Sequence, residues 1–152
     1  MSSIYPLMAA LLANILAQIL KPIVLYFRTR NFDVHQCIAC GGFPSSHSST
    51  VTALTIAIGM LEGFDSNLFA ITCVFSFIVI YDAANVRYYA GRNIQLTKQL
   101  ISDLETLKGL KFSDPIYHEK IKSVLGHKFV EILGGVLLGI LVSLTMYQLI
   151  HL

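Results

Sequence analysis

The chain ends in FVEILGGVLLGILVSLTMYQLIHL (Phe129–Leu152), an apolar stretch interrupted near its start by Glu131. A helix that crosses the hydrocarbon core of a bilayer needs about 20 predominantly apolar residues. This stretch is long enough, so the sequence predicts a membrane-spanning helix here. The Gly135-xxx-Gly139 spacing, with Gly134 beside it, predicts that this helix packs closely against another one.

Three further apolar stretches precede it, at Ile4–Phe27, Ser45–Leu61 and Asn67–Tyr81. The first lacks the basic residues and the cleavage site of a signal peptide, so we expect it to remain as a membrane helix that kinks or ends near Pro22. The two middle stretches can span only if their polar ends lie inside the protein. We therefore expect an all-α integral membrane helical bundle with about four transmembrane helices, forming a single domain over residues 1–152.

The composition excludes a water-soluble globule. Of the 152 residues, 55% are hydrophobic and only 13% are charged, whereas soluble domains carry roughly 25% charged residues. The mean hydropathy is +0.66. The formal net charge of +2 is too small to indicate nucleic-acid binding.

A polar segment, roughly Arg92 to Lys128, separates the third apolar stretch from the fourth. Its leucines recur at near-helical spacing, which predicts an amphipathic helix on the membrane surface or packed against the bundle. The sequence at Phe112–Pro115 predicts a turn, followed by a second short helix. We thus expect amphipathic interfacial helices in the long loop after the third span.

The basic residues predict the orientation of the chain. All eleven Lys and Arg side chains fall in the connections after the first and third stretches, and the link around Glu62–Asp65 has none. The positive-inside rule makes those connections cytoplasmic. We expect a protein of the cell inner membrane with both termini outside and its site facing the cytoplasm.

The three cysteines do not indicate a disulfide framework, because their number is odd. Cys37 and Cys40 form a CxxC motif with His35 nearby, but no second pair or thioredoxin-like context accompanies them. We interpret them as ordinary thiols and expect no metal site, although their role stays open.

Most side chains able to do chemistry lie at the helix ends on the predicted cytoplasmic side. Ionisable groups are costly in a membrane and usually functional. The gathering of cations, histidines and carboxylates predicts a site for an anionic group, formed by Lys21, Arg28, Ser45, Ser46, His47, Asp82, Arg87, His127 and Glu131.

The strongest single feature is the run GGFPSSHSS at Gly41–Ser49. Pro44 suits a first helical turn, and the serines can cap the helix that follows. A helix N-terminus combines free amides with a positive dipole end and can therefore bind phosphate. His47, in the first turn, could donate a proton to a leaving oxygen. The alternative interpretation is a serine-rich cap that only starts the helix.

Two pairs of ionisable residues suggest further roles in the predicted site. His127 and Glu131 are spaced i, i+4, so the carboxylate can fix the imidazole tautomer and stabilise its charged form, as a nucleophile or base requires. The alternative is an interfacial histidine beside a solvated glutamate. Asp82 and Arg87 form either a structural ion pair or part of the site.

Together these motifs resemble the signature of the type-2 phosphatidic acid phosphatase superfamily, K-x6-R-P, P-S-G-H and S-R-x5-H-x3-D. Lys21 and Arg28 match the first motif, Pro44–His47 the second, and His127 with Glu131 the third. The runs GGFPSSHS and YDAANVR are similar to the small divergent branch of that superfamily. The resemblance covers most of the chain.

The resemblance implies a lipid phosphatase that needs no metal and no cofactor. His127 would attack phosphorus and form a phosphohistidine, Glu131 would orient it, and His47 would protonate the leaving alkoxide. Preorganised hydrogen-bond donors would bind the phosphate oxygens and stabilise the phosphoryl group. The resemblance gives this role to Lys21, Arg28, Ser45 and Ser46.

The chain departs from the signature at several positions. In the first motif Thr29 replaces Pro, and in the second motif Ser46 replaces Gly. In the third motif Glu131 replaces Asp, and Lys120 and Ile121 occupy the positions of Ser and Arg. Arg87 is our candidate for the missing arginine, with Lys122 and Asp82 as supporting residues.

The leading prediction is therefore a membrane phosphatase whose substrate is a phospholipid monoester, with phosphatidylglycerophosphate first and phosphatidic acid second. A non-catalytic lipid-phosphate binding or transport protein is the alternative, and a purely structural membrane protein is a third possibility. The glycine-rich last helix also makes a homodimer plausible.

Overall fold

The computed structural model describes residues 4–30, 41–108 and 128–151, and these residues contain helices and no strand. The elements, in chain order, are α1 (Tyr5–Thr29), α2 (Ser46–Glu62), α3 (Asn67–Tyr81), a π-helical turn η3 (Asp82–Val86), α4 (Arg87–Lys108) and α6 (Phe129–His151). The all-α prediction is confirmed for this part of the chain. Pro22 does not end the first helix, because α1 continues to Thr29.

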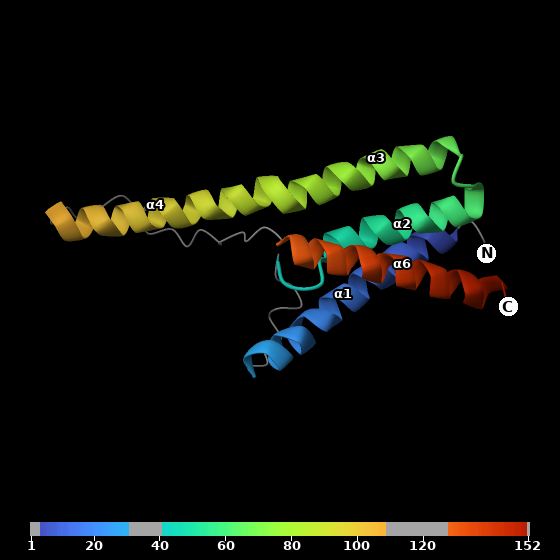
Figure 1. Cartoon of the computed structure of the whole chain (residues 1–152), viewed down its shortest axis with the longest axis horizontal. Helices are drawn as coiled ribbons and strands as arrows, with labels where there is room; N and C mark the ends of the chain where they lie inside the picture. The colour runs from blue at the N-terminus through green and yellow to red at the C-terminus, as the bar shows by residue number, and fades with distance from the viewer. Residues whose placement is uncertain (1–3, 31–40, 109–127, 152) are drawn as a thin grey trace.

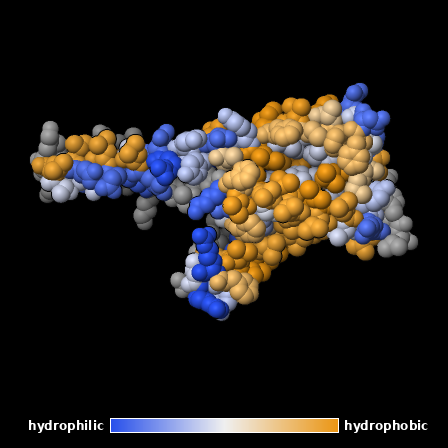
Figure 2. Space-filling model, viewed as in Figure 1, coloured by the Kyte–Doolittle hydropathy of each residue, from blue (hydrophilic) through white to orange (hydrophobic). Residues whose placement is uncertain are grey.

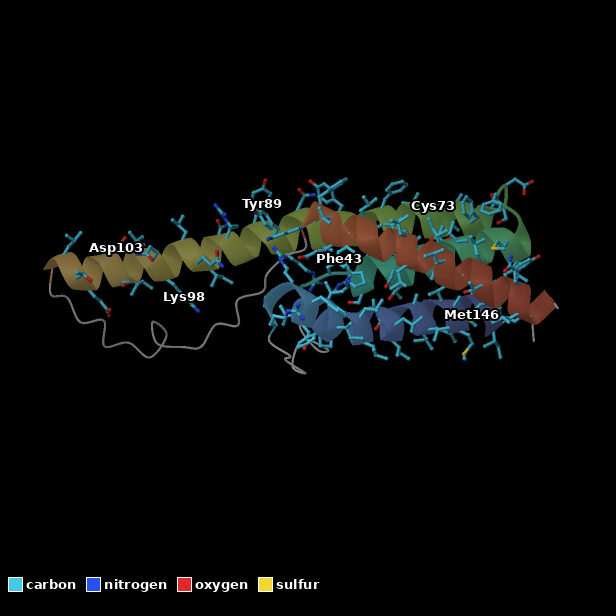
Figure 3. All side chains as sticks on the ribbon, turned by 60° about the horizontal axis from the view of Figure 1, so that its bottom comes forward. Phe43, Cys73, Tyr89, Lys98, Asp103 and Met146 are labelled. Carbon is cyan, nitrogen blue, oxygen red and sulfur yellow. The ribbon has the colours of Figure 1, made fainter. Side chains whose placement is uncertain are left out.

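Helix α2 lies at the centre of the bundle, where it packs against α1, α3 and α6 (Figure 1). Small side chains allow this close approach: Ala13 of α1 and Ala53 of α2 are fully buried and form one core cluster with Val142 of α6. The partly buried Met146, labelled in Figure 3, packs against this cluster. Helices that pack by van der Waals contact in a membrane use small residues in this way.

The glycines of α6 confirm the predicted close packing. A Cβ added at Gly135 would collide with the carbonyl oxygen of Ser45, and one at Gly139 would lie 2.6 Å from the carbonyl oxygen of Ser49. Both obstacles are backbone atoms of the α2 segment, so only glycine fits at these two positions.

In the part of the chain that the structure describes, three helical segments are long and apolar enough to cross a membrane, namely Tyr5–Thr29, Asn67–Leu107 and Phe129–Ile150. Large apolar side chains of α3 point outward, with Phe77 74% and Ile71 64% exposed, as expected of a helix that faces lipid. Among the described residues, three helices therefore qualify as spans, and the predicted four spans are not confirmed. Helix α2 has 17 residues, and at about 1.5 Å per residue it rises about 25 Å, slightly less than a bilayer core.

The third apolar helix does not stop at Asp82. The chain passes through η3 into α4, and α3, η3 and α4 form one rod whose α4 part projects from the bundle with Lys98 and Asp103 (Figures 1 and 3). Leu96, Leu100 and Leu107 of α4 are exposed. An interfacial position of this helix is not confirmed, and the predicted turn at Phe112–Pro115 lies outside the described residues.

The polar ends of the helices meet at one end of the bundle. Both chain termini lie at the opposite end (Figure 1). Figure 2 shows an apolar surface over the bundle, with hydrophilic residues where α1 ends and where α3 passes into α4. This end, formed by the C-terminus of α1 and the N-termini of α2 and α6, is called the polar end below.

Candidate functional site

The candidate site includes the first turn of α2. Ser45 is the N-cap, with an extended backbone, and its Oγ accepts a hydrogen bond from the Ser48 backbone N–H at 3.3 Å. The Ser48 hydroxyl donates to the same Oγ at 3.0 Å. The predicted serine cap is confirmed, because a short hydroxyl can satisfy an amide that has no partner within the helix. Pro44 precedes the cap and does not lie in the first turn as expected.

Lys21 of α1 reaches this turn from the neighbouring helix. Its side chain is only 3% exposed, and its Nζ lies 3.5 Å from Ser46 Oγ. The Gln18 side-chain amide donates to the same Oγ at 3.4 Å. Buried charged groups are normally paired or hydrogen-bonded, and Lys21 has further interactions besides its bond to Ser46.

The start of α6 is fixed to the start of α2 by a backbone hydrogen bond. The Ser45 N–H donates to the Glu131 carbonyl oxygen at 2.9 Å. The Glu131 carboxylate accepts a hydrogen bond from the Lys128 backbone N–H at 3.2 Å, so its Oε2 caps α6. The absence of a side chain at Gly135 permits this approach.

Helices α2 and α6 run in the same direction from the polar end (Figure 1). Each helix N-terminus carries a partial positive charge and amides that lack partners in the helix. The two termini are joined by the Ser45–Glu131 backbone bond, Lys21 adjoins the first turn of α2, and Glu131 adds a carboxylate at the start of α6. The arrangement suits an anion with several acceptor oxygens, such as a phosphate group.

The structure brings together only part of the predicted set. Lys21 adjoins Ser46, Ser45 is bonded to Glu131 through the backbone, and the half-buried His47 lies in the same first turn of α2. Arg28 is exposed in the last turn of α1.

Asp82 and Arg87 interact with each other across η3. Arg87 Nε lies 2.7 Å from Asp82 Oδ2, and both side chains are more than 40% exposed, at 44% for Arg87 and 41% for Asp82. The structural ion pair is therefore observed. Arg87 has further interactions besides this pair.

His127 and Lys122 lie outside the described residues, as do Cys37, Cys40 and His35. Their predicted roles therefore stay predictions. Among the described residues, no three His, Cys, Asp or Glu side chains are grouped so that they could hold a metal ion.

Sequence reasoning missed the contribution of Gln18 and of its neighbour Asn14, whose amide donates to Thr50 Oγ1 at 2.8 Å. The spacing of these polar residues in the sequence could have indicated their role. Asn14, Gln18 and Lys21 are the polar interruptions of the first apolar stretch, and their i, i+4, i+7 spacing puts them on one helical face. This face lies against the polar first turns of α2.

The family model described as the "Divergent PAP2 family" matches residues 3–142 of the chain. The chain belongs to the divergent PAP2 family. The resemblance inferred from the motifs is thus confirmed at the level of the family. The chain is also 35% identical over 147 residues to "Uncharacterized membrane protein YuiD" of Bacillus subtilis (strain 168), with 93% of each chain covered. No solved structure matches the chain.

Membership in the divergent PAP2 family and the similarity to a membrane protein agree with the apolar helices of the structure. The chain is a membrane PAP2-like protein.

Proposed function

We propose that this protein is an integral membrane phosphatase that hydrolyses a lipid phosphomonoester through a phosphohistidine intermediate. The observation that carries the proposal is the position of Lys21, which is buried with its Nζ 3.5 Å from Ser46 Oγ. There it adjoins the joined N-termini of α2 and α6. A cation beside a helix N-terminus can bind the oxygens of an anionic ligand there.

The proposed mechanism assigns one role to each group. A nitrogen of the His127 imidazole attacks phosphorus and forms an N–P bond, while the P–O bond to the lipid alkoxide breaks. His47 supplies the proton that the alkoxide takes. Water then hydrolyses the phosphohistidine and releases inorganic phosphate. Glu131 orients His127 in this scheme, in addition to capping α6.

Lys21, Ser45 and Ser46 bind the phosphate oxygens in this proposal, through the ammonium group, the hydroxyls and the backbone amides. Such preorganised donors lower the barrier because charge develops on the phosphoryl oxygens in the transition state. The roles of Arg28, Arg87, Asp82 and Lys122 stay predictions.

The substrate that fits best is a phosphomonoester in the cytoplasmic leaflet. We place the polar end in the cytoplasm because ten of the eleven basic residues follow the first or the third apolar stretch, and the eleventh, Lys21, lies in the part of α1 near that end. In this arrangement α2 is the fourth span. Phosphatidylglycerophosphate is our first choice of substrate and phosphatidic acid our second.

The test is phosphate release by the purified protein in detergent from each of these two lipids, with EDTA present. We expect release that His127→Ala abolishes and that a control substitution on the projecting α4, Arg92→Ala, leaves intact. Absence of release by a folded protein from both lipids would refute the assignment of these substrates. Release that persists in His127→Ala would refute the phosphohistidine.

A non-catalytic lipid-phosphate binding or transport protein is the second candidate. The specific observation in its favour is Ile121, which occupies the position of the third motif's arginine. This candidate predicts that His127→Ala retains lipid binding while no variant, including the parent protein, releases phosphate.

A further inference from the structure

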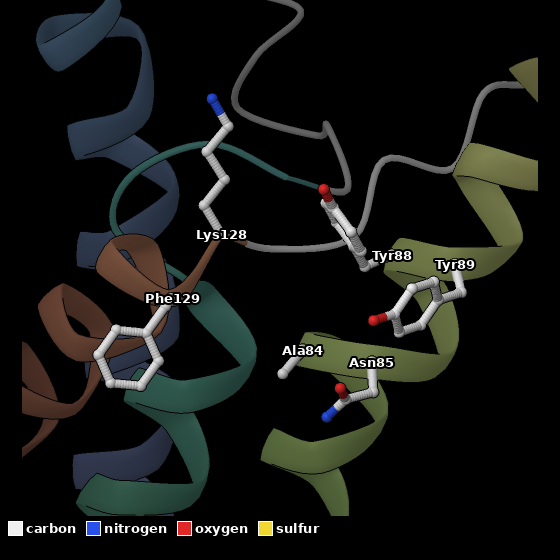
Figure 4. Close-up of a pocket in the computed structure, with 6 residues that line it drawn as sticks. All are labelled: Ala84, Asn85, Tyr88, Tyr89, Lys128 and Phe129. Carbon is white, nitrogen blue, oxygen red and sulfur yellow. The ribbon is translucent and has the colours of Figure 1, made fainter.

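Several polar side chains meet at one atom where α1 packs on α2. The Ser46 hydroxyl oxygen accepts a hydrogen bond from the Gln18 amide at 3.4 Å and lies 3.5 Å from Lys21 Nζ. By contrast, Lys128 lines a depression of about 340 Å³ between α6 and the rod, but its ammonium group extends away from the polar side chains across it (Figure 4). Of these two places, only the contact of α1 with α2 brings polar groups together.

The Gln18 amide uses one of its two ends in this contact. Its Nε2 donates to Ser46, whereas its carbonyl oxygen Oε1 is buried and has no hydrogen-bond partner in the part of the chain that the structure describes. Buried polar atoms normally have a partner, and a carbonyl oxygen can only accept. The missing partner of Oε1 is therefore a hydrogen-bond donor.

The groups beside Gln18 have the opposite requirement. The Lys21 ammonium group carries donors only. The Ser46 hydroxyl oxygen receives one donor from Gln18 and one from Lys21, which occupy both of its lone pairs, so its own proton is left for an acceptor. Lys21 and Ser46 thus suit the oxygens of an anion, and Gln18 Oε1 suits a hydroxyl group on that same anion.

The presence of a P–OH group distinguishes the phosphate compounds that could bind here. Inorganic phosphate and singly protonated phosphomonoesters carry this group, whereas phosphodiesters and sulfate do not. We propose that Gln18 is a specificity-determining residue whose Oε1 accepts a hydrogen bond from P–OH and so favours phosphomonoesters over phosphodiesters. The proposal rests on the phosphate site of the proposed function. Phosphodiester lipids surround a membrane protein in excess, and an acceptor left unpaired disfavours their binding.

The test measures binding without turnover. The purified protein in detergent carries His127→Ala, so that no ester is consumed, and it is dialysed to equilibrium against radiolabelled inorganic phosphate. The pH is about 6, where about half of the phosphomonoester groups carry a proton. The competitors, at constant ionic strength, are sulfate, the phosphomonoester lysophosphatidic acid and the phosphodiester lysophosphatidylglycerol with the same acyl chain.

We expect lysophosphatidic acid to displace phosphate at least about tenfold more strongly than lysophosphatidylglycerol does, as one unpaired buried acceptor would cause. Unlabelled phosphate should exceed sulfate by a similar factor. Gln18→Met removes the acceptor and should abolish both preferences. Gln18→Glu keeps an acceptor in the same place and should retain them, while its negative charge weakens the binding of every anion. The matched control is Asn14→Leu, one turn away, whose amide bonds Thr50 and not Ser46; it should change neither preference.

Equal displacement by the two lysolipids would overturn the proposal, as would a protein that binds no phosphate. Preferences that persist in Gln18→Met, or that Asn14→Leu removes equally, would also overturn it. Loss of the preferences in Gln18→Glu would show that Gln18 donates to the phosphate instead. None of these readouts depends on phosphate release, so selective binding without hydrolysis would refute the phosphatase and leave the role of Gln18 intact.

Discussion

At the scale of single residues, Lys21 is the most informative side chain in the structure. Its ammonium group is withdrawn from water and held against the first turn of α2. A lysine that only solubilised the helix end would extend into solvent, as long cationic side chains usually do. Lys21 therefore links the packing of α1 to the proposed phosphate site.

Replacing Lys21 by methionine should test this link. Methionine keeps much of the length and removes the charge, so the helix packing should survive while the phosphate loses a donor. We expect phosphate release to fall by about 100-fold, the typical effect of removing one preorganised donor. The measurement is the initial rate on phosphatidylglycerophosphate, with the melting temperature as the check on folding. Unchanged release with unchanged stability would contradict a phosphate-binding role for Lys21.

A second prediction for single residues concerns the Asp82–Arg87 ion pair. Its partners are each more than a third exposed, and water and salt screen such pairs, so their coupling is typically below about 1 kcal/mol. A double-mutant cycle on stability with Asp82→Asn and Arg87→Gln should therefore give a small coupling energy. A coupling of several kcal/mol would instead show that the pair holds η3 in place.

At the scale of elements, the contact between α2 and α6 positions the site. The Ser45 N–H bonds the Glu131 carbonyl, and Gly135 lies directly against the Ser45 backbone. Because the neighbouring atoms belong to the main chain, they cannot move aside for a methyl group. The distance between the two helix N-termini is therefore set by glycine.

Gly135→Ala should destabilise the protein by about 1–3 kcal/mol, the usual cost of overpacking. The matched control is Gly134→Ala, whose added methyl group would have ring atoms of Phe43 as its nearest neighbours, a side chain that is 39% exposed and can move. Thermal unfolding in detergent should show the larger decrease in melting temperature for Gly135→Ala. The reverse order would mean that α2 and α6 do not pack as described.

At the scale of the whole molecule, helix directions put both termini at one end and the candidate site at the other (Figure 1). The proposed orientation, with the basic connections in the cytoplasm, predicts that the termini lie outside. Alkaline phosphatase, which is active only outside the cytoplasm, should be active when fused after Leu152 and inactive when fused after Lys108. The opposite pattern would reverse the proposed orientation, and activity of both fusions would contradict the topology.

Much of the fold was predictable because its causes are local. The apolar length of residues 129–152 requires a helix in a membrane, since a helix satisfies its own backbone hydrogen bonds in lipid. The serine cap of α2 depends on neighbouring residues in the chain, and the Gly135-xxx-Gly139 spacing predicted close packing from one helical face. The family was recognisable because its motifs are runs of adjacent residues.

The sequence by itself therefore determined the membrane class, the family and the starting points of the helices that carry the motifs. Only the tertiary structure decided that α2 lies at the centre, that Lys21 and Gln18 meet Ser46, and that α3 continues through a π-helical turn. The physical reason is that periodicity fixes which face of a helix is polar but not which helix that face meets. That choice depends on close packing among small residues from helices far apart in the chain.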